Sequence, residues 1–253
     1  MKIGVVGLGL IGGSIFKDLK KQGFDVVGIS QSQSGTCIYK DYAELKDCEL
    51  VFVCSAMNKT LGVLDELEKY LSPETVVTDV CSLKSFVCNK QRPYKFIPSH
   101  PMAGTEHKGF ENSFEGMFRG AKWVITPVNV SIEEGSVLTK IIERLGAEIV
   151  VATPEKHDEA VALISHMPMV IAQAIFKTAE ENELAMKIAS SGFRDMTRLA
   201  MSNTEMANDM VMMNSDNIQN AILKLYKSVG DLTNSEYKKQ IEEIRAKRSE
   251  MFK

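Results

Sequence analysis

A glycine-rich segment near the N-terminus constrains the fold most. It follows an apolar run at residues 2–7 that is typical of a buried strand, and it precedes a helical pattern at 11–21. In such a strand–turn–helix unit the glycines permit a tight turn, close approach of a pyrophosphate and close helix–strand packing. The helix N-terminus then offers free N–H groups to phosphates. The segment therefore predicts a dinucleotide-binding loop made of Gly7, Leu8, Gly9, Leu10, Ile11 and Gly12.

Short apolar runs alternate with helical patterns up to residue 152. Further strands are predicted at 24–29, 50–54, 75–79, 95–99, 122–126 and 148–152, with helices at 59–71 and 131–145. This alternation is typical of a parallel sheet covered on both faces. We therefore expect residues 1–152 to form an α/β domain of the Rossmann type, with a doubly wound, mainly parallel sheet.

The pattern changes after Thr153-Pro154. Helices are predicted at 155–180, 184–189, 195–213, 216–228 and 235–251, so residues 153–253 are expected to form an all-helical domain. The last helix is strongly charged and is expected to keep one face in solvent. An apolar cluster is interpreted as helical core or subunit contact, namely Met206, Met210, Val211, Met212 and Met213. Because the helical domain is too short for a large core of its own, we predict a homodimer.

The composition excludes several classes of partner. A net charge of −3 gives no basic excess for nucleic acid or a membrane surface. No apolar run approaches the roughly 20 residues of a membrane-spanning helix. The N-terminus has no signal-peptide pattern, and the five cysteines lack CxxC spacing. We expect a cytoplasmic protein with reduced thiols, no metal site and no nucleic-acid or membrane partner.

The end of the second strand bears on the choice of cofactor. An NAD site usually has a carboxylate there, which binds the ribose hydroxyls. Here the strand is followed by Ser30, Gln31 and Ser32, which offer hydroxyl and amide donors but neither a carboxylate nor an arginine. We therefore expect NADP to be favoured over NAD. Ser55 and Asp79, at the ends of two other strands, are also expected at the cofactor site.

Two loops at the carboxyl ends of predicted strands carry candidate chemistry, because ligands of open α/β sheets bind at that edge. His100 follows the strand at 95–99 and is a candidate proton acceptor. Ser82 could bind a substrate hydroxyl or cap a helix. Asp79 could also be a structural turn acceptor, and Lys84 could contact phosphate or be solvated. His107 is expected in solvent.

The helical domain supplies further candidates. Arg194 and Arg198 are four residues apart, so on a helix they would share a face, and arginine suits bidentate carboxylate binding. His157 and His166 are nine apart, about half a turn out of phase on a straight helix. Unless Pro168 distorts the helix, only one of them can face a site. We prefer His166 and expect His157 at the surface or at a helix start.

Taken together, five blocks resemble the prephenate/arogenate dehydrogenases of tyrosine biosynthesis. They are GLGLIGGS at 7–14, TDVCSLK at 78–84, SHPMAGTE at 99–106, HDEAVALISHMP at 157–168 and SGFRDMTR at 191–198. The resemblance implies a Rossmann domain followed by a helical dimerisation domain. No fused chorismate mutase or regulatory domain is expected in this length.

The resemblance also implies roles for single residues. It assigns the catalytic histidine to His100, the hydroxyl-binding serine to Ser82 and the arginine for the ring carboxylate to Arg198. An acid that in some members gates the site or senses the substrate side chain falls on Glu106. NADP-using members carry an arginine where this chain has Gln31. Some members have a second histidine three residues after His166, where this chain has Met169.

The implied reaction is oxidative decarboxylation of prephenate or arogenate, with hydride transfer to NAD(P)⁺. It yields 4-hydroxyphenylpyruvate or tyrosine, and aromatisation makes it essentially irreversible. Two other interpretations stay open at this stage. One is another two-domain oxidoreductase, such as a β-hydroxyacid dehydrogenase or an imine reductase, although the HPMAGTE block does not suit these. The other is a non-catalytic dinucleotide sensor, which would not need His100 or Arg198.

Overall fold

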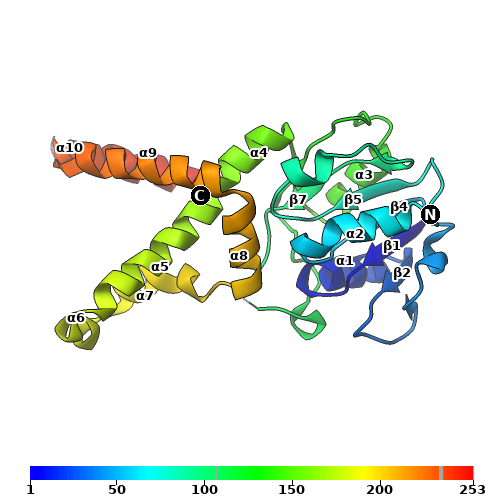
Figure 1. The fold of residues 1–253 in the computed structure, drawn as a ribbon, viewed down its shortest axis with the longest axis horizontal. Helices are drawn as coiled ribbons and strands as arrows, with labels where there is room; N and C mark the ends of the chain where they lie inside the picture. The colour runs from blue at the N-terminus through cyan, green and yellow to red at the C-terminus, as the bar shows by residue number, and fades with distance from the viewer. Residues whose placement is uncertain (106, 234–235, 253) are drawn as a thin grey trace.

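The computed structural model describes residues 1–105, 107–233 and 236–252. Its N-terminal part contains a six-stranded parallel sheet in the order β3-β2-β1-β4-β5-β6 (Figure 1). The strands are β1 (Lys2–Val6), β2 (Asp25–Ile29), β3 (Ile38–Tyr39), β4 (Leu50–Val53), β5 (Val76–Asp79) and β6 (Lys95–Phe96). The predicted Rossmann-type parallel sheet is confirmed.

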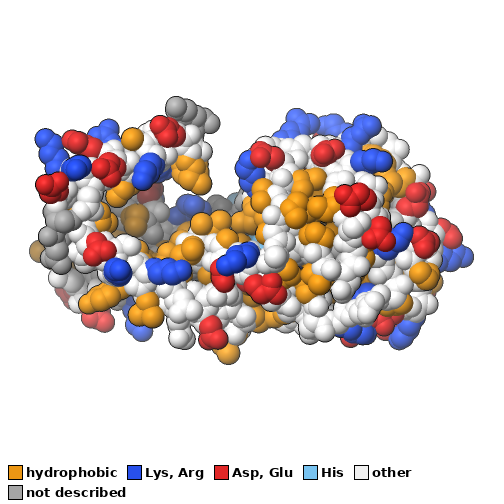
Figure 2. Space-filling model, turned by 90° about the horizontal axis from the view of Figure 1, so that it is seen from above, with side chains coloured by type: hydrophobic (Ala, Val, Ile, Leu, Met, Phe, Trp, Pro, Cys, Tyr) orange, Lys and Arg blue, Asp and Glu red, His pale blue; other side chains and the backbone are white. Residues whose placement is uncertain are grey.

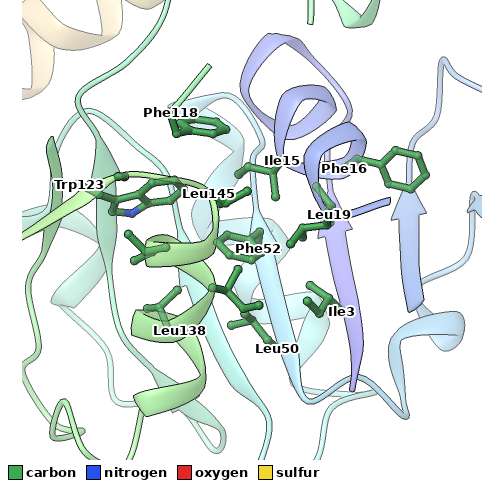
Figure 3. Packing of buried hydrophobic residues seen from close by; sticks show 14 of the residues in the cluster. Ile3, Ile15, Phe16, Leu19, Leu50, Phe52, Phe118, Trp123, Leu138 and Leu145 are labelled. Atoms are coloured by element: carbon green, nitrogen blue, oxygen red, sulfur yellow. The ribbon is translucent and has the colours of Figure 1, made fainter. Parts of the chain in front are cut away.

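Helices cover both faces of this sheet, because successive residues of a strand point to opposite sides. Phe52 packs on one face with apolar residues of α1 (Leu10–Lys21) and α3 (Ser136–Arg144), as Figure 3 shows. Its neighbour Val53 packs on the other face with residues of α2 (Met57–Leu67). The two clusters hold the carboxyl ends of the strands at one edge, where the glycine loop also lies.

A second, three-stranded sheet departs from the sequence prediction. Its strands are β7 (Ser99–Pro101), β8 (Lys122–Ile125) and β9 (Glu148–Val151), with β7 antiparallel and β9 parallel to β8. The predicted single strand at 95–99 is wrong, because the chain leaves the first sheet after Phe96. Pro98 lies at the break, and it has no N–H to continue a strand ladder.

After β9 the described chain is helical. The helices are α4 (Pro154–Val161), α5 (Met167–Glu180), α6 (Glu183–Ile188), α7 (Ser191–Thr197), α8 (Thr204–Met213), α9 (Ser215–Thr233) and α10 (Tyr237–Met251). A π-helical segment, η4 (Ala162–His166), joins α4 to α5, and a 3₁₀ helix, η5 (Arg198–Met201), follows α7. Figure 1 shows α9 and α10 extending side by side away from the sheets. The predicted all-helical character of this region is confirmed.

One helix prediction is corrected. The predicted helix at 195–213 is broken, because Asn203 caps α8 by accepting a hydrogen bond from the Met206 N–H at 3.0 Å. The solvated face expected for the last helix is present, since no described residue of α10 is buried. The methionine cluster is divided, since Met210 is buried whereas Met212 is exposed.

The helices meet the α/β part at an apolar cluster, which we call the interdomain cluster. It joins buried residues of α2, α4, α5 and α8 to the loop after β5, namely Met57, Cys81, Leu83, Val161, Met169, Ala207 and Met210. Cys81 and Leu83 flank Ser82, so this packing sets the position of the Ser82 loop. Figure 2 shows the surface hollowed between the projecting helices and the larger α/β part.

The continuous helical stretch Pro154–Glu180, which consists of α4, η4 and α5, is long and apolar enough to cross a membrane by length and composition alone. The sequence did not predict this, because the stretch contains no unbroken apolar run of that length. Only 28% of its most apolar window is buried within the chain. Such a helix is weak evidence for a membrane segment, because helices that pack against other protein pass the same test.

Candidate active site

The glycine loop has the shape of a phosphate cradle. Gly7 has a φ of +88°, which favours glycine, and a Cβ on Gly12 would lie 2.0 Å from the Gly7 carbonyl oxygen. By contrast, a Cβ on Gly9 would meet nothing within 4 Å, so this side of the loop is open. The helix α1 starts at Leu10 with no acidic residue in its first turn and no side-chain cap. The loop therefore fits a dinucleotide pyrophosphate.

The segment after β2 forms a polar rim beside this loop. Ser30 is largely buried, and its hydroxyl accepts a hydrogen bond from the Gln33 N–H at 3.0 Å. Gln31 and Ser32 are exposed. Ser55 follows β4, and its backbone nitrogen lies 3.1 Å from where a Cβ on Gly7 would stand. These predicted cofactor residues therefore surround the same edge of the sheet.

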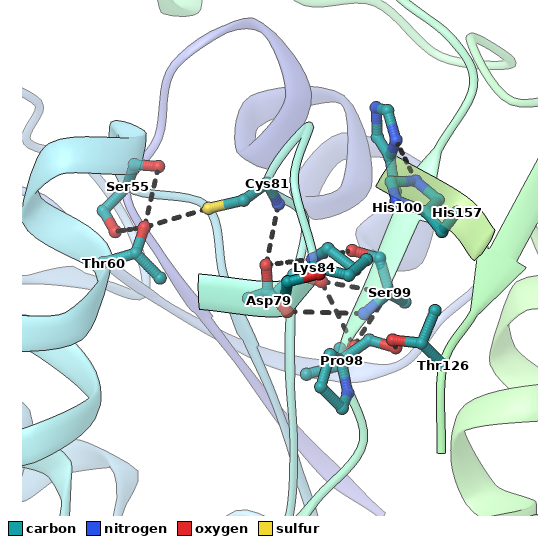
Figure 4. A network of polar contacts seen from close by, with 12 residues as sticks. Ser55, Thr60, Asp79, Cys81, Lys84, Pro98, Ser99, His100, Thr126 and His157 are labelled. Atoms are coloured by element: carbon teal, nitrogen blue, oxygen red, sulfur yellow. Dashed lines mark hydrogen bonds and ion pairs between the residues drawn. The ribbon is translucent and has the colours of Figure 1, made fainter. Parts of the chain in front are cut away.

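Asp79 and Lys84 form an ion pair that is fully enclosed in protein (Figure 4). The Asp79 carboxylate also accepts the Cys81 N–H at 2.9 Å, as expected for a turn acceptor. The Lys84 ammonium donates to the Ser99 carbonyl at 2.7 Å. Lys84 is thus neither solvated nor free to contact a phosphate, and both sequence interpretations of it are wrong. Because the Asp79 carboxylate is enclosed as well, it offers no open oxygen to a cofactor.

Ser82 lies in the loop that this ion pair anchors. The 3₁₀ helix that follows, η2 (Ser85–Cys88), has Lys84 as its N-cap residue, so Ser82 does not cap it. Ser82 is partly exposed, and its hydroxyl has no hydrogen-bond partner among the described residues. The hydroxyl is therefore available to a ligand.

His100 lies in the middle of β7, where it pairs with Val124 of β8, and not in a loop after the first sheet. His100 as a whole residue is of intermediate burial. The Nδ1 atom of His100 is 2.9 Å from Nε2 of His157, and the two rings meet edge to face at 72°. His100 is thus held by a residue of the helical part.

The contact of His157 with His100 was not predicted from the sequence. His157 lies in the first turn of α4, as one alternative predicted, but it is buried rather than at the surface. On a straight helix His157 and His166 would point in nearly opposite directions. The segment η4 changes this phase, because it adds a wider π-helical turn before His166. The useful signal was the His157–Asp158 pair inside the block at 157–168.

Asp158 connects this histidine to the Ser82 loop. One oxygen, Oδ1, lies 2.8 Å from Nδ1 of His157 and accepts the Lys84 N–H at 2.8 Å. The other, Oδ2, accepts the Ser85 N–H at 2.9 Å. Burial acts to raise the pKa of Asp158, but these hydrogen bonds outweigh it and lower the pKa. The carboxylate is therefore ionised at neutral pH.

The ionised Asp158 carboxylate determines which ring nitrogen carries the proton in His157 and in His100. Since Asp158 can only accept, Nδ1 of His157 carries the proton and its Nε2 is an acceptor. Nδ1 of His100 then donates to that Nε2, which leaves Nε2 of His100 unprotonated. Burial, followed by the nearby His157 and Lys84, holds the pKa of His100 well below its usual range. His100 is thus a neutral imidazole whose bare Nε2 can accept a proton.

His166, for which a substrate contact is predicted, is fully buried. Asn214 donates to the Asp158 carbonyl at 3.0 Å and lies 3.2 Å from Nδ1 of His166. The other ring nitrogen, Nε2, has no hydrogen-bond partner among the described residues. Burial lowers the pKa of His166 to about 4. Asn214 thus links His166 to the backbone of Asp158, and a contact of His166 with the substrate stays a prediction.

Three remaining candidates, Arg194, Arg198 and His107, are exposed. Arg198 is exposed at the start of η5 and forms no ion pair with the described residues. Its neighbour Leu199 packs against the interdomain cluster. Arg194 is exposed beside Asp195, and His107 is exposed as expected. Glu106 lies outside the described residues.

The buried His166 predicts how the free energy of unfolding depends on pH. Its pKa is about 4 in the folded chain, against 6.5 for an ordinary histidine, so the unfolded chain binds this proton more readily. The contribution of His166 to the free energy of unfolding is therefore complete above pH 6.5 and is lost as the pH falls towards 4. Between pH 7 and pH 5 we expect the wild type to lose about 2 kcal/mol more unfolding free energy than His166→Gln. Denaturant titrations at one protein concentration measure both losses. Equal losses in the two proteins would contradict the burial argument.

Comparisons with known proteins agree with this geometry. A family model for the nucleotide-binding domain of prephenate dehydrogenase matches residues 17–151, and one for its dimerization domain matches residues 153–249. A prephenate dehydrogenase of Bacillus subtilis (strain 168) is 31% identical over 238 residues, which is 85% of this chain. The chain spans 64% of that relative's length.

Two solved structures resemble the whole chain. Synechocystis arogenate dehydrogenase has a TM-score of 0.81 at 32% identity, covering 99% of this chain and 97% of its own. A. aeolicus prephenate dehydrogenase, in complex with hydroxyphenyl propionate and NAD⁺, has a TM-score of 0.85 at 25% identity, covering 99% and 98%. The chain therefore belongs to the prephenate dehydrogenase family.

Proposed function

We propose that the chain catalyses the NAD(P)-linked oxidative decarboxylation of prephenate or arogenate in tyrosine biosynthesis. The observation that carries this proposal is the hydrogen-bonded series Asp158–His157–His100, which leaves Nε2 of a neutral His100 unprotonated. The adjacent Ser99 is tied through Lys84 to Asp79, at the carboxyl end of β5. A module that only senses a dinucleotide has no use for such a proton acceptor. The names of the relatives support the same reaction.

His100 is the proton acceptor of the proposed mechanism. Its Nε2 takes the proton of the substrate's 4-hydroxyl group as that carbon becomes a carbonyl carbon on the way to the phenol. The positive charge that develops on the His100 imidazole is stabilised through His157 by the ionised Asp158. The ring carboxylate departs as CO₂, and the product is 4-hydroxyphenylpyruvate from prephenate or tyrosine from arogenate.

Ser82 orients the same hydroxyl group. Its own hydroxyl has no partner among the described residues, and its loop is fixed from two sides. The Lys84 ammonium ties the loop to Asp79 of β5 and to the Ser99 carbonyl of β7, and Asp158 accepts the Lys84 N–H. A fixed loop keeps the serine and the histidine at one distance, which a positioned acid–base pair requires.

The glycine loop and the rim after β2 hold the cofactor. When bound, the nicotinamide cofactor supplies the acceptor for the hydride that leaves the substrate. Gly9 leaves room for the pyrophosphate, and Ser30, Gln31 and Ser32 line the ribose position without a carboxylate. A carboxylate there would repel a 2′-phosphate, so its absence supports a preference for NADP over NAD.

Arg198 binds the ring carboxylate of the substrate. Its guanidinium forms no ion pair with the described residues, and a planar guanidinium matches a carboxylate in two parallel hydrogen bonds. Glu106 senses the substrate side chain, a role taken from the family resemblance alone. The domain boundary near residue 152 lies between β9 and α4.

We further propose that two copies associate through the helical domain, in the cytoplasm. The family model that matches this region is named for dimerization. Large apolar side chains are exposed along α5–α7 and η5, among them Phe176, Leu184, Ile188, Met196 and Met201. A second copy that covers this surface would account for the low burial of the long apolar helix.

The catalytic role of His100 is tested by its replacement with asparagine. We expect His100→Asn to lower kcat with prephenate or arogenate by roughly 10²–10⁴, the usual scale for a lost acid–base group. Cofactor binding, followed by nucleotide fluorescence, should be unchanged. The control is His107→Asn, because His107 is exposed. Near-normal turnover of His100→Asn would refute the assignment, and loss of activity in both variants would show a general effect.

The role of Arg198 is tested against its exposed neighbour. Arg198→Gln should weaken substrate binding by roughly 1.5–3 kcal/mol, because a hydrogen bond to a charged group is lost. Arg194→Gln removes the same charge and should leave substrate binding unchanged. Steady-state KM values for substrate and cofactor measure both effects. If Arg198→Gln impairs cofactor and substrate binding equally, the arginine contacts the cofactor instead.

A further inference from the structure

The segment after β2 contains a single charged side chain. Residues 30–39 are polar or apolar and uncharged, and Lys40 is the first charged residue after the strand. In the sequence, a lysine ten positions beyond Ser30 has no evident link to the cofactor. In the structure, the chain brings Lys40 back to the side of Ser30.

The short strand β3 returns the chain to the side of β2. The two strands are parallel and in register, with Ile29 opposite Tyr39. The ladder continues with a hydrogen bond of 2.9 Å from the Ser30 N–H to the Tyr39 carbonyl. The Gln31 side-chain amide donates to the Lys40 carbonyl at 3.1 Å. Lys40 therefore stands next to Ser30 and Gln31 at the carboxyl edge of the sheet.

The ammonium group of Lys40 is available. Lys40 is exposed, and it forms no hydrogen bond or ion pair through its side chain with the described residues. The following residue, Asp41, is the nearest acid in the sequence, and its carboxylate accepts the Ala43 N–H at 2.9 Å as the cap of the next 3₁₀ helix, η1 (Tyr42–Leu45). This corner thus has one uncommitted positive charge.

We propose that Lys40 provides the counter-charge for the 2′-phosphate of NADP, beside the donors of Ser30, Gln31 and Ser32. The proposal rests on the proposed preference for NADP and names the residue that confers it. The 2′-phosphate is a dianion, which hydroxyl and amide donors alone leave uncompensated. A lysine is suited to bind it as a point charge, in place of a guanidinium.

A matched control exists on the opposite edge of the sheet. Lys46 is also exposed and follows η1, in which the Glu44 carbonyl accepts from Lys2 at the amino end of β1. Lys46→Met therefore removes the same charge far from the carboxyl edge. Lys40→Arg keeps the charge at the proposed position.

The experiment measures two quantities for the wild type, Lys40→Met, Lys40→Arg and Lys46→Met. The first is the ratio of kcat/KM with NADP to that with NAD. The second is the affinity for adenosine 2′,5′-bisphosphate and for adenosine 5′-monophosphate by calorimetry, which needs no turnover. We expect Lys40→Met to lower the ratio and the bisphosphate affinity about tenfold, or about 1.4 kcal/mol. Monophosphate affinity should not change, and Lys40→Arg and Lys46→Met should resemble the wild type.

The outcomes separate this proposal from the one on which it rests. A wild type that favours NADP, with a ratio unchanged in Lys40→Met, overturns the role of Lys40 alone. Equal losses in Lys40→Met and Lys46→Met also overturn it, because they indicate a general charge effect. A wild type that favours NAD and binds both adenosine nucleotides equally overturns the NADP preference, and the Lys40 site with it.

Discussion

At the base of the site, the Asp158 carboxylate joins two segments from different parts of the fold. It binds His157 in its own helix, and it binds the backbone N–H groups of Lys84 and Ser85 in the loop after β5. Through His157 it fixes the ring of His100, and through the loop it fixes Ser82. One buried charge thus aligns both side chains that would contact the substrate hydroxyl. The hydrogen bonds that the carboxylate accepts lower its pKa and so keep it ionised.

The enclosed Lys84–Asp79 pair complements this contact. Buried ion pairs contribute little net stability, since both ions lose their hydration. The consequence here is geometric, because Lys84 also binds the Ser99 carbonyl next to His100. The ends of β5 and β7, which belong to different sheets, are thereby held together. The positive charge of Lys84 also acts with burial to keep His100 neutral.

The features that depend on neighbouring residues alone could be predicted from the sequence. The glycine loop, the parallel strands and the helical region follow from backbone sterics and apolar periodicity, and they are present as expected. Predictions that needed contacts between distant segments failed. Lys84 was predicted to be solvated or to contact phosphate, because the sequence does not show that Asp79 is its partner. His157 was predicted at the surface or at a helix start, because the sequence does not show that η4 alters the phase of the helix. Pro98 marked the break in the strand at 95–99, but it did not reveal a second sheet.

Asp158, acting through His157, leaves Nε2 of His100 without a proton. Nitrogen-15 NMR of the imidazole rings measures this directly, and the chain has only four histidines, so single replacements assign the signals. At neutral pH we expect His100 to be neutral, with the proton on Nδ1 and a bare Nε2. A His100 ring that carries its proton on Nε2, or on both nitrogens, would contradict it.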